Sequence, residues 1–369
     1  MSVSMITPIS RRGFISSAAV GALALGTGAR LRANELLGGK RKLGVALMGL
    51  GSYSRGQLGP ALRETELCEL RGVVTGDEAK GNRWAQSYGF SPKSVYSYDN
   101  MAAIADDPNI DIVYSVTPPG LHLRDVLAGA AAGKHVICEK PMAVSVDECE
   151  TMIAACDAAK VRLSIGYRLH FHAYHQQVKE MAATGAWGGA IVMNGGFGYR
   201  DGVKTWRTSK ALGGGGQLMN VGIYVIQSAL MAKGEEMPIA ITAHEPPKVR
   251  PDFFDEVEET MKFTLEFADG SKCEGMSSGE IGANHFEAEG KKQVRLAPAY
   301  SYDGLRMTVD GKELAPIDGF NQQAHQMDGF AAAILKNEPS IVPGQMGMRD
   351  IRITSAIYEA ARTGKRVML

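Results

Sequence analysis

The stretch KLGVALMGLGSYS, residues 42–54, joins a continuous apolar run to a glycine-rich turn. Consecutive apolar residues, without the alternation of a half-buried strand, are typical of a strand covered on both faces of a parallel sheet. A helical stretch follows the turn. In that arrangement the turn and the start of the helix bind the pyrophosphate of a dinucleotide, so the segment predicts the first β-turn-α unit of a dinucleotide-binding domain.

The glycines of this turn have separate tasks. Gly49 permits the tight turn, and Gly51 lets the backbone approach the phosphates. Ser54 stands where a third glycine is usual, and it is small enough for close packing of the helix on the strand. We therefore place four residues of the turn in the cofactor site, namely Gly49, Gly51, Ser52 and Tyr53.

Further apolar runs continue the pattern along the chain. They occupy residues 70–76, 110–117, 135–140 and 162–167, with segments of helix length between them at 77–88, 121–133 and 145–160. Strands and helices that alternate at this spacing indicate a parallel sheet with right-handed crossovers. The predicted fold class is α/β, with a doubly wound N-terminal domain.

The end of the second apolar run bears on the choice of cofactor. An acidic residue at that position would bind the ribose 2′-hydroxyl of NAD, but Thr75 stands there, followed by Gly76. The hydroxyl of Thr75 and the nearby Lys80 suit a 2′-phosphate, so we favour NADP. Asp77 lies two residues later and would serve NAD if the loop is tight, which leaves NAD open as the alternative.

Composition sets outer limits on function. At 369 residues the chain is long enough for two domains of ~150 residues each. A formal net charge of +0 argues against nucleic acid as a partner. The five cysteines follow no metal or disulfide spacing, and His170, His172 and His175 lack a matching carboxylate or cysteine set. We therefore predict no metal site.

The N-terminal segment predicts export. Arg11 and Arg12 precede 17 uncharged residues, 13–29, that are rich in Ala, Gly and Ser. The sequence SRRGFI, residues 10–15, resembles the motif read by the twin-arginine export machinery, which carries folded proteins. We predict a signal peptide over residues 1–33 and a periplasmic protein. An uncleaved anchor is the alternative, although the run falls short of ~20 strongly apolar residues.

The fourth apolar run ends in a charged pair followed by proline, Glu139-Lys140-Pro141. The carboxyl ends of parallel strands face the crevice in which ligands bind, so we place Lys140 beside the nicotinamide. A surface turn that carries an ion pair is the alternative interpretation. Glu139 and Thr117 are also counted among the predicted cofactor-binding residues.

Four segments are shared with a known family, namely GKHVICEKPMAVSVDE (133–148), GYRLHFHAYH (166–175), GGGGQLMNVGIY (213–224) and IYEAARTGKRV (357–367). With them the chain resembles the Gfo/Idh/MocA oxidoreductases, and among these the periplasmic glucose–fructose oxidoreductases, from about Lys42 to the C-terminus. The resemblance implies a Rossmann domain over residues 42–161. It also implies that residues 162–369 form an α/β domain with a large, mostly antiparallel open sheet, which binds substrate and forms a homodimer or homotetramer.

The second half of the chain carries signals of its own. The alternating run of residues 258–278 predicts a hairpin with Asp269-Gly270 at its turn. Residues 346–363 predict a helix that ends at Gly364. The glycine run 213–216 precedes a helical segment and allows backbone to pack tightly against a ligand, although a flexible connection is the alternative.

The resemblance assigns chemistry to that helical segment. Asn220 and Tyr224 are four residues apart and share one face. In similar sugar oxidoreductases the tyrosine is the acid/base that accepts the hydroxyl proton as hydride leaves for the nicotinamide. A free tyrosine ionises near pH ~10, so it needs a neighbouring cation, for which Lys140 is the candidate. The family usually has Asp where Asn220 stands, and an amide binds a hydroxyl but takes no proton.

The resemblance also outlines a sugar pocket. Arg168 is counted with the cofactor-binding residues as well, and a structural ion pair is its alternative role. The predicted catalytic residues are Lys140, Asn220 and Tyr224. The predicted substrate-binding residues are Lys140, Tyr167, Arg168, His170, Asn220 and Tyr224.

These observations together predict a periplasmic sugar oxidoreductase with a tightly bound cofactor. It would oxidise an aldose to its lactone and reduce a second sugar or carbonyl compound. Because no free cofactor pool is expected outside the cytoplasm, the cofactor would be loaded before export and retained. Two alternatives stay open: a glycoside hydrolase that uses bound NAD for transient oxidation and elimination, and a non-catalytic sugar-binding protein on the same fold.

Overall fold

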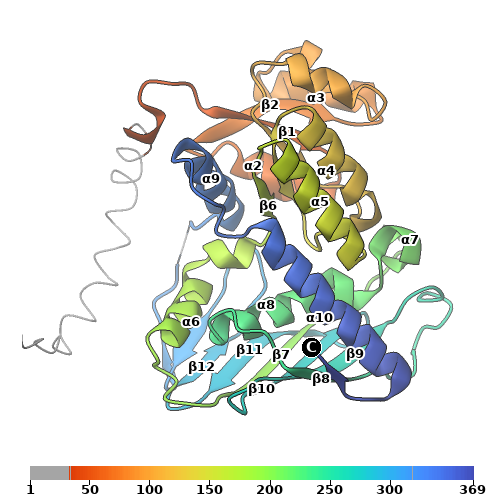
Figure 1. Cartoon of the computed structure of the whole chain (residues 1–369), viewed down its shortest axis with the longest axis vertical. Coiled ribbons are helices and arrows are strands. Elements are labelled where there is room, and N and C mark those ends of the chain that lie inside the picture. The colour runs from red at the N-terminus through yellow and green to blue at the C-terminus, as the bar shows by residue number, and fades with distance from the viewer. Residues whose placement is uncertain (1–32, 34, 318) are drawn as a thin grey trace, which may run out of the picture.

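The chain folds around two β-sheets, one in the upper and one in the lower half of Figure 1. This computed structural model describes residue 33 and residues 35–317 and 319–369. The first sheet has the strand order β3-β2-β1-β4-β5-β6, and every neighbouring pair is parallel. Its strands are β1 (Leu43–Met48), β2 (Cys68–Val74), β3 (Val95–Tyr96), β4 (Ile112–Ser115), β5 (His135–Cys138) and β6 (Leu163–Ile165). The predicted doubly wound sheet is confirmed.

The central strand β1 shows why a continuous apolar run takes this place. The residues from Val45 to Met48 are all fully buried, because β2 and β4 flank the strand and helices cover both faces of the sheet. The two-residue strand β3 was not predicted. It is defined by its pairing with β2 rather than by an apolar run.

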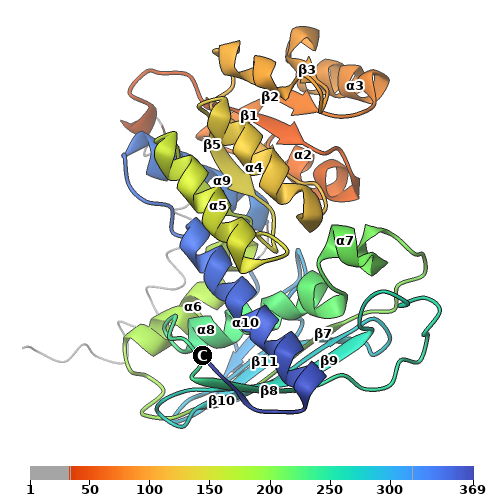
Figure 2. The same ribbon diagram turned by 45° about the vertical axis from the view of Figure 1, so that its right-hand side comes forward.

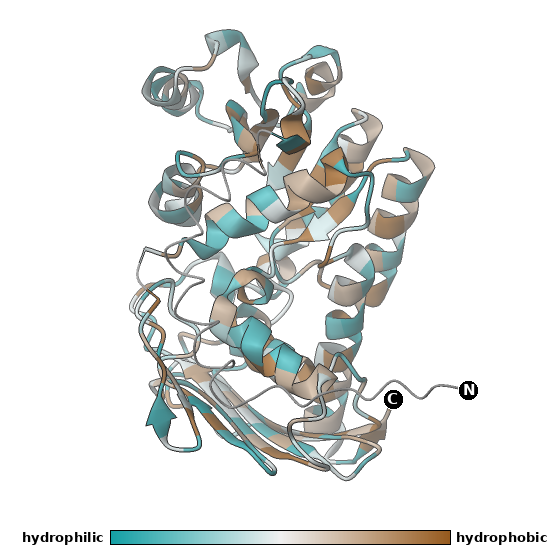
Figure 3. Cartoon of the chain, turned by 90° about the vertical axis from the view of Figure 1, so that its left-hand side faces the viewer, coloured by the Kyte–Doolittle hydropathy of each residue, from teal (hydrophilic) through white to brown (hydrophobic). Residues whose placement is uncertain are grey.

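Helices surround this sheet close to the predicted ranges. They are α3 (Glu78–Tyr88), α4 (His122–Ala131) and α5 (Val146–Ala158), and Figure 3 shows hydrophilic residues on outward-facing parts of the helices. The stretch after the glycine-rich turn is helical but irregular. It begins with a π-helical turn, Ser54–Leu58, and continues as the short α2 (Gly59–Ala61).

The boundary between the two halves differs from the predicted one. Strand β6 lies beyond residue 161 and yet forms the sixth strand of the first sheet, so this domain extends through Ile165. The C-terminal part of the chain also returns to it. Helix α9 (Gln322–Leu335) buries Met327 and Phe330 in one hydrophobic cluster with residues of β1 and β2.

The second sheet has nine strands in the order β14-β13-β12-β11-β7-β10-β9-β8-β15. Its strands are β7 (Val192–Gly198), β8 (Ala240–His244), β9 (Thr260–Glu266), β10 (Lys272–Ser278), β11 (Ala283–Glu289), β12 (Gln293–Leu296), β13 (Met307–Val309), β14 (Lys312–Glu313) and β15 (Val367–Met368). Only the β7–β10 pair is parallel, so the sheet is mostly antiparallel, as predicted. The predicted hairpin is β9–β10, with Gly270 at φ 87° in its turn.

Helices cover one face of the second sheet. They are α6 (Ala173–Ala183), α8 (Ile223–Ala232) and α10 (Gly344–Thr363), while the short α7 (Lys210–Gly213) reaches up to the start of α4. Figures 1 and 2 show these helices on the same side of the sheet and the other side left open by the described part of the chain. Helix α10 starts two residues before the predicted range and ends at Gly364, whose φ is 65°.

The predicted export signal, residues 1–33, lies outside the described residues except for Ala33, which is buried beside α9. The predicted motif at residues 10–15 is therefore not part of the structural description. No helix within residues 35–317 or 319–369 is long and apolar enough to cross a membrane.

Candidate active site

The turn after β1 is built for a close approach of ligand to backbone. Gly49 has φ 96°, and a side chain there would lie 3.1 Å from the carbonyl oxygen of Val116, so only glycine fits without strain. A side chain on Gly51, by contrast, would meet no atom within 4 Å. Ser54 stands in place of the usual third glycine, and its buried hydroxyl stabilises the turn by donating a 2.5 Å hydrogen bond to the Gly49 carbonyl.

The end of β2 offers a hydroxyl, and the nearest carboxylate, that of Asp77, already caps a helix. Thr75 is buried, and its Oγ1 accepts from the backbone N–H of Asp77. Asp77 itself caps helix α3, because its Oδ1 accepts a 2.8 Å bond from the backbone N–H of Lys80. The residues Thr75, Gly76 and Lys80 therefore stand together at the strand end, with Tyr98 next to Gly76. This arrangement fits the 2′-phosphate of NADP better than the free ribose hydroxyl of NAD.

Glu139 is a buried support for its neighbour. Tyr114 donates a 2.7 Å hydrogen bond to Glu139 Oε1, and the backbone N–H of Lys140 donates to Oε2 at 3.1 Å. Gln326 of α9 in turn donates to the Tyr114 hydroxyl. Burial raises the pKa of Glu139, and the charge of Lys140 opposes that rise. Glu139 thus fixes the segment that carries Lys140, and its predicted role in cofactor binding stays a prediction.

Two polar residues that sequence reasoning passed over hold the adjoining loop. His122 is fully buried, with its ring nitrogens 2.8 Å from the carbonyl oxygen of Thr117 and 3.0 Å from that of Pro141. Asp125, also fully buried, accepts from the Thr117 hydroxyl at 2.5 Å. The loop after β4 is thereby tied to the loop after β5. The signal that could have indicated this contact is the pair of polar residues, His122 and Asp125, in the otherwise mostly apolar segment 121–133.

The side chain of Lys140 forms one hydrogen bond to the second domain. Its Nζ donates a 2.7 Å hydrogen bond to the backbone carbonyl of Asn220. That carbonyl belongs to a π-helical turn, Leu218–Gly222, which directly precedes α8. Such wide turns recur at functional sites. The predicted proximity of Lys140 and Asn220 is therefore present in the structure.

Tyr224 lies on the next turn of the helix, and two cationic side chains lie over its ring. Lys140 Nζ is 4.7 Å from the ring centroid, and the guanidinium carbon of Arg168 is 4.8 Å from it. Burial on its own would raise the pKa of Tyr224, but the positive charges of Arg168 and Lys140 outweigh it, so the pKa lies below its ordinary value. The structure brings the predicted catalytic residues Lys140, Asn220 and Tyr224 into one site.

Both the oxygen and the nitrogen of the Asn220 side-chain amide form hydrogen bonds to neighbouring side chains. Its Oδ1 accepts a 3.3 Å bond from Arg207 Nε, and its Nδ2 donates to the hydroxyl of Tyr199 and to Gln217 Oε1. A carboxylate could not donate to Gln217, so these partners explain why asparagine rather than aspartate stands here. Tyr199, Arg207 and Gln217 were not identified from the sequence, because they are brought to Asn220 by the tertiary fold rather than by a shared pattern.

Comparison with known proteins accounts for this arrangement. Residues 43–167 match the family described as "Oxidoreductase family, NAD-binding Rossmann fold", and residues 175–295 match the "GFO/IDH/MocA C-terminal domain". The chain belongs to the Gfo/Idh/MocA family. It is therefore an oxidoreductase with a nicotinamide-dinucleotide-binding domain, and the family predicted from the four sequence segments is confirmed.

Individual relatives cover almost the whole Gfo/Idh/MocA unit. The aldose-aldose oxidoreductase of Caulobacter crescentus is 38% identical, with a TM-score of 0.86 over 89% of this chain and 100% of that one. The D-xylose 1-dehydrogenase [NADP(+)] of Haloarcula marismortui is 25% identical over 88% of this chain and 92% of its own. The D-glucoside 3-dehydrogenase of Escherichia coli is 27% identical over 89% and 97%.

Other predicted pocket residues of this family member lie in the interior. Tyr167 is fully buried and stacks on His170 at 6.1 Å, and His170 approaches Glu235 at 3.8 Å rather than the Lys140–Tyr224 group. Arg168 is only 2% exposed and bonds to the chain around Tyr300. The structure thus separates Tyr167 and His170 from the catalytic residues, while Arg168 stays beside Tyr224.

The three histidines of the GYRLHFHAYH segment are packed as aromatic groups. Burial lowers the pKa of His170 and of His172 to about 4, and it lowers that of His175 as well. The rings of His172 and His175 meet edge to face at 5.8 Å. Within residues 33, 35–317 and 319–369, no three His, Cys, Asp or Glu side chains gather as a metal site would require.

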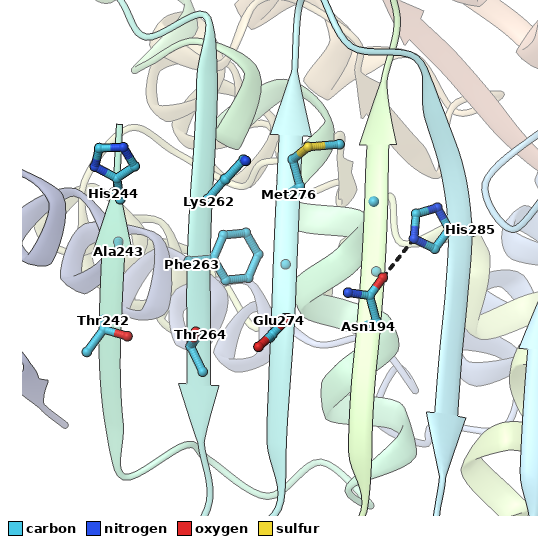
Figure 4. Close-up of a pocket in the computed structure, with 13 residues that line it drawn as sticks. Asn194, Thr242, Ala243, His244, Lys262, Phe263, Thr264, Glu274, Met276 and His285 are labelled. Carbon is cyan, nitrogen blue, oxygen red and sulfur yellow. Dashed lines mark hydrogen bonds between the residues drawn. The ribbon is translucent and has the colours of Figure 1, made fainter. Parts of the chain in front are cut away.

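A hollow lies away from this site, on the open face of the second sheet. It measures about 480 Å³ and is floored by strands β7 to β11, as Figure 4 shows. Polar and apolar side chains alternate on it, among them Asn194, Lys262 and Glu274, and His285 lies 2.8 Å from Asn194.

Proposed function

We propose that this chain is an NADP-dependent aldose oxidoreductase that keeps its cofactor between turnovers. It would oxidise one aldose at C1 to the lactone and use the reduced cofactor to convert a second aldose to the alditol. The observation that carries the proposal is the pair of cations, Lys140 and Arg168, set on the ring of Tyr224. The relative from Caulobacter crescentus, named an aldose-aldose oxidoreductase, supports the same reaction class.

The chain supplies binding, orientation and proton transfer. When bound, the nicotinamide is the acceptor of hydride in the first half-reaction and its donor in the second. Tyr224, as phenolate, accepts the proton of the C1 hydroxyl when the aldose is oxidised, and as phenol it returns that proton to the oxygen of the second aldose. Lys140 and Arg168 stabilise the phenolate form. Asn220 orients the sugar through its amide.

Several residues fit the cofactor itself. Gly49 and Gly51 leave the turn after β1 open to the pyrophosphate, and Thr75 and Lys80 stand where the ribose 2′-substituent is read. The carboxylate of Asp77 is used to cap α3. Two haloarchaeal relatives are named as NADP(+) enzymes, which supports the same choice. NAD remains the alternative that the following measurement decides.

Purified protein given D-glucose, with no cofactor added, is expected to form gluconolactone and sorbitol in equal amounts. The reason is that one retained cofactor passes hydride from the first sugar to the second in a ping-pong sequence. NMR of the products and mass spectrometry of the denatured protein, which should release NADP, check this. Gly51→Asp, whose carboxylate would repel the pyrophosphate, is the matched control and should lack both cofactor and products.

Three outcomes, in that experiment or with a glycoside as the substrate, would replace the proposal. If the protein needed added NADP for every turnover, the proposal that the cofactor stays bound between turnovers would be wrong. Release of free sugar from a glycoside, with no net oxidation or reduction, would favour the glycoside hydrolase. A protein that binds sugar and forms no product would be the non-catalytic alternative.

We also propose export by the twin-arginine pathway to the periplasm. The motif SRRGFI at residues 10–15 supports it, and a route that carries folded proteins lets the cofactor travel inside. Changing Arg11 and Arg12 to Lys together should leave the protein in the cytoplasmic fraction of a bacterial host. Changing Arg30 and Arg32 to Lys is the matched control and should not. Equal periplasmic amounts for both variants would contradict the proposal.

We propose that the open face of the second sheet joins two copies of the chain. Two features of this face support the pairing. Val192 is apolar and yet 69% exposed, and the face carries the hollow of about 480 Å³. Light scattering should give twice the chain mass, or four times if two such dimers associate. Thr264→Arg, in the middle of the face, should yield monomers, whereas Glu313→Arg on the exposed edge strand β14 should not. A monomeric parent protein would disprove the pairing.

A further inference from the structure

We propose that Arg168 is a positioning residue that keeps Tyr224 ready to give up its proton, and that it binds neither sugar nor cofactor. The inference rests on the proposed acid/base role of Tyr224, and it reassigns a residue that the sequence places among the ligand contacts. It depends on three observations: how Arg168 is held, what its charge faces, and which other charges surround Tyr224.

Arg168 is held by hydrogen-bond acceptors that carry no charge. Its Nη2 donates to the carbonyl of Tyr300 at 2.5 Å, and its Nη1 donates to the carbonyl of Ser301 at 3.1 Å and to Gln322 Oε1 at 2.6 Å. All three acceptors are neutral. Arg168 is 2% exposed and forms no salt bridge within the described ranges, and the carboxylate that feels its charge is Glu139. The field of a buried guanidinium without a direct ion-pair partner acts strongly on the groups beside it.

The nearest groups are two phenol rings. The guanidinium carbon lies 4.8 Å from the ring centroid of Tyr224 and 4.8 Å from that of Tyr302. Tyr302 in turn contacts Tyr53 of the cofactor-binding turn, with ring centroids 5.9 Å apart. The charge of Arg168 therefore acts first on Tyr224 and also on the phenols Tyr53 and Tyr302. A residue in this place acts on the reaction through Tyr224.

The other charged and titratable groups around Tyr224 divide into two sets. Lys140, from the segment after β5, adds a second positive charge, and Glu139 opposes both. The remaining neighbours are phenols from three parts of the chain, namely Tyr53, Tyr199, Tyr300 and Tyr302. Burial raises the pKa of each of these phenols. Only Tyr224 has a lowered pKa, and Arg168 is the largest of the influences that lower it.

The side chains of Lys140 and Arg168 differ in how freely they can move. Lys140 bonds to the Asn220 carbonyl on a flexible stem, so it can turn toward substrate. Arg168 is fixed by three bonds and keeps its proton at any pH at which the protein is folded. Its field is therefore a permanent part of the site. Since a lowered phenol pKa leaves more phenolate at a given pH, oxidation should gain rate as pH rises and level off above the pKa of Tyr224.

Tyrosinate absorbance tests the inference without any substrate. The titration of the holoenzyme minus that of Tyr224→Phe isolates Tyr224, whose pKa is expected below its ordinary ~10. Arg168→Gln should move that midpoint up by about one to three pH units, and Arg168→Lys should restore part of the difference. Arg63→Gln is the matched control, because Arg63 also stacks on a tyrosine, Tyr88 at 4.5 Å, far from the site.

A second variant keeps the test decisive if Arg168→Gln does not fold. Lys140→Met removes the other cation, and Tyr224 should still ionise below ~10 because Arg168 remains. The inference is overturned if Tyr224 of the holoenzyme ionises at or above ~10, if Arg168→Gln leaves the midpoint unchanged, or if Lys140→Met alone restores the ordinary value. Absence of sugar turnover would disprove the proposed function and leave this titration unaffected.

Discussion

Replacing Tyr224 with phenylalanine is expected to lower turnover of an aldose by about 10²- to 10⁴-fold, the usual contribution of a positioned acid/base. The substitution removes the hydroxyl and keeps the ring, which packs against Phe197 at 5.6 Å and Tyr300 at 6.0 Å. The fold should therefore persist. Cofactor content should also persist, because the residues predicted to hold the cofactor lie in the first domain.

Single-turnover kinetics give the sharpest measurement. The absorbance of reduced nicotinamide should appear slowly in Tyr224→Phe, with the amplitude of the parent protein, because chemistry rather than binding is impaired. Tyr88→Phe is the matched control, since it removes a hydroxyl from a ring stacked on Trp84 and remote from the site. If Tyr224→Phe turned over at the parent rate, another group would have to take the proton, and the acid/base assignment would fall.

The first domain could be predicted from the sequence because its signals are local. Each strand of the parallel sheet except β3 overlaps a predicted apolar run, and Gly49 marks the turn whose φ of 96° demands glycine. The pairing of Lys140 with the Asn220 segment was also predictable, but by a different route. It came from family motifs that lie 80 positions apart, which no local pattern connects.

Sequence reasoning identified Arg168 and Asn220 but missed the long-range contacts through which they act. Arg168 faces Tyr224 only because the loop at Tyr300 folds back over it, 132 positions later. The amide of Asn220 makes sense only beside Arg207 and Gln217. Neither set of contacts can be read from a periodicity or a motif in the sequence, because these side chains meet only in the tertiary fold. A polar residue in a buried segment signals that a partner exists without identifying it.

Glu258 is the clearest case of such a hidden support. It is 5% exposed, and its carboxylate accepts from the backbone N–H groups of Gly216 and Leu218, each at 2.8 Å, and from the hydroxyl of Tyr358 at 3.0 Å. The carbonyl of Gly216 then accepts from the N–H of Asn220, whose own carbonyl accepts from Lys140. A side chain on Gly216 would lie 2.0 Å from the Glu258 carbonyl oxygen, so this run is tight rather than flexible.

Replacing Glu258 with leucine should therefore cost about 3 kcal/mol of unfolding free energy, because two buried N–H donors and a hydroxyl lose their acceptor. The shift of the π-helical turn that carries Asn220 should also slow turnover by about 10- to 100-fold, as small misplacements of reacting groups do. Urea unfolding and kcat measure the two effects. Glu256→Leu is the matched control, since that exposed carboxylate accepts only from the backbone of Lys210. Equal stability of the two variants would show that the glycine run holds its shape without Glu258.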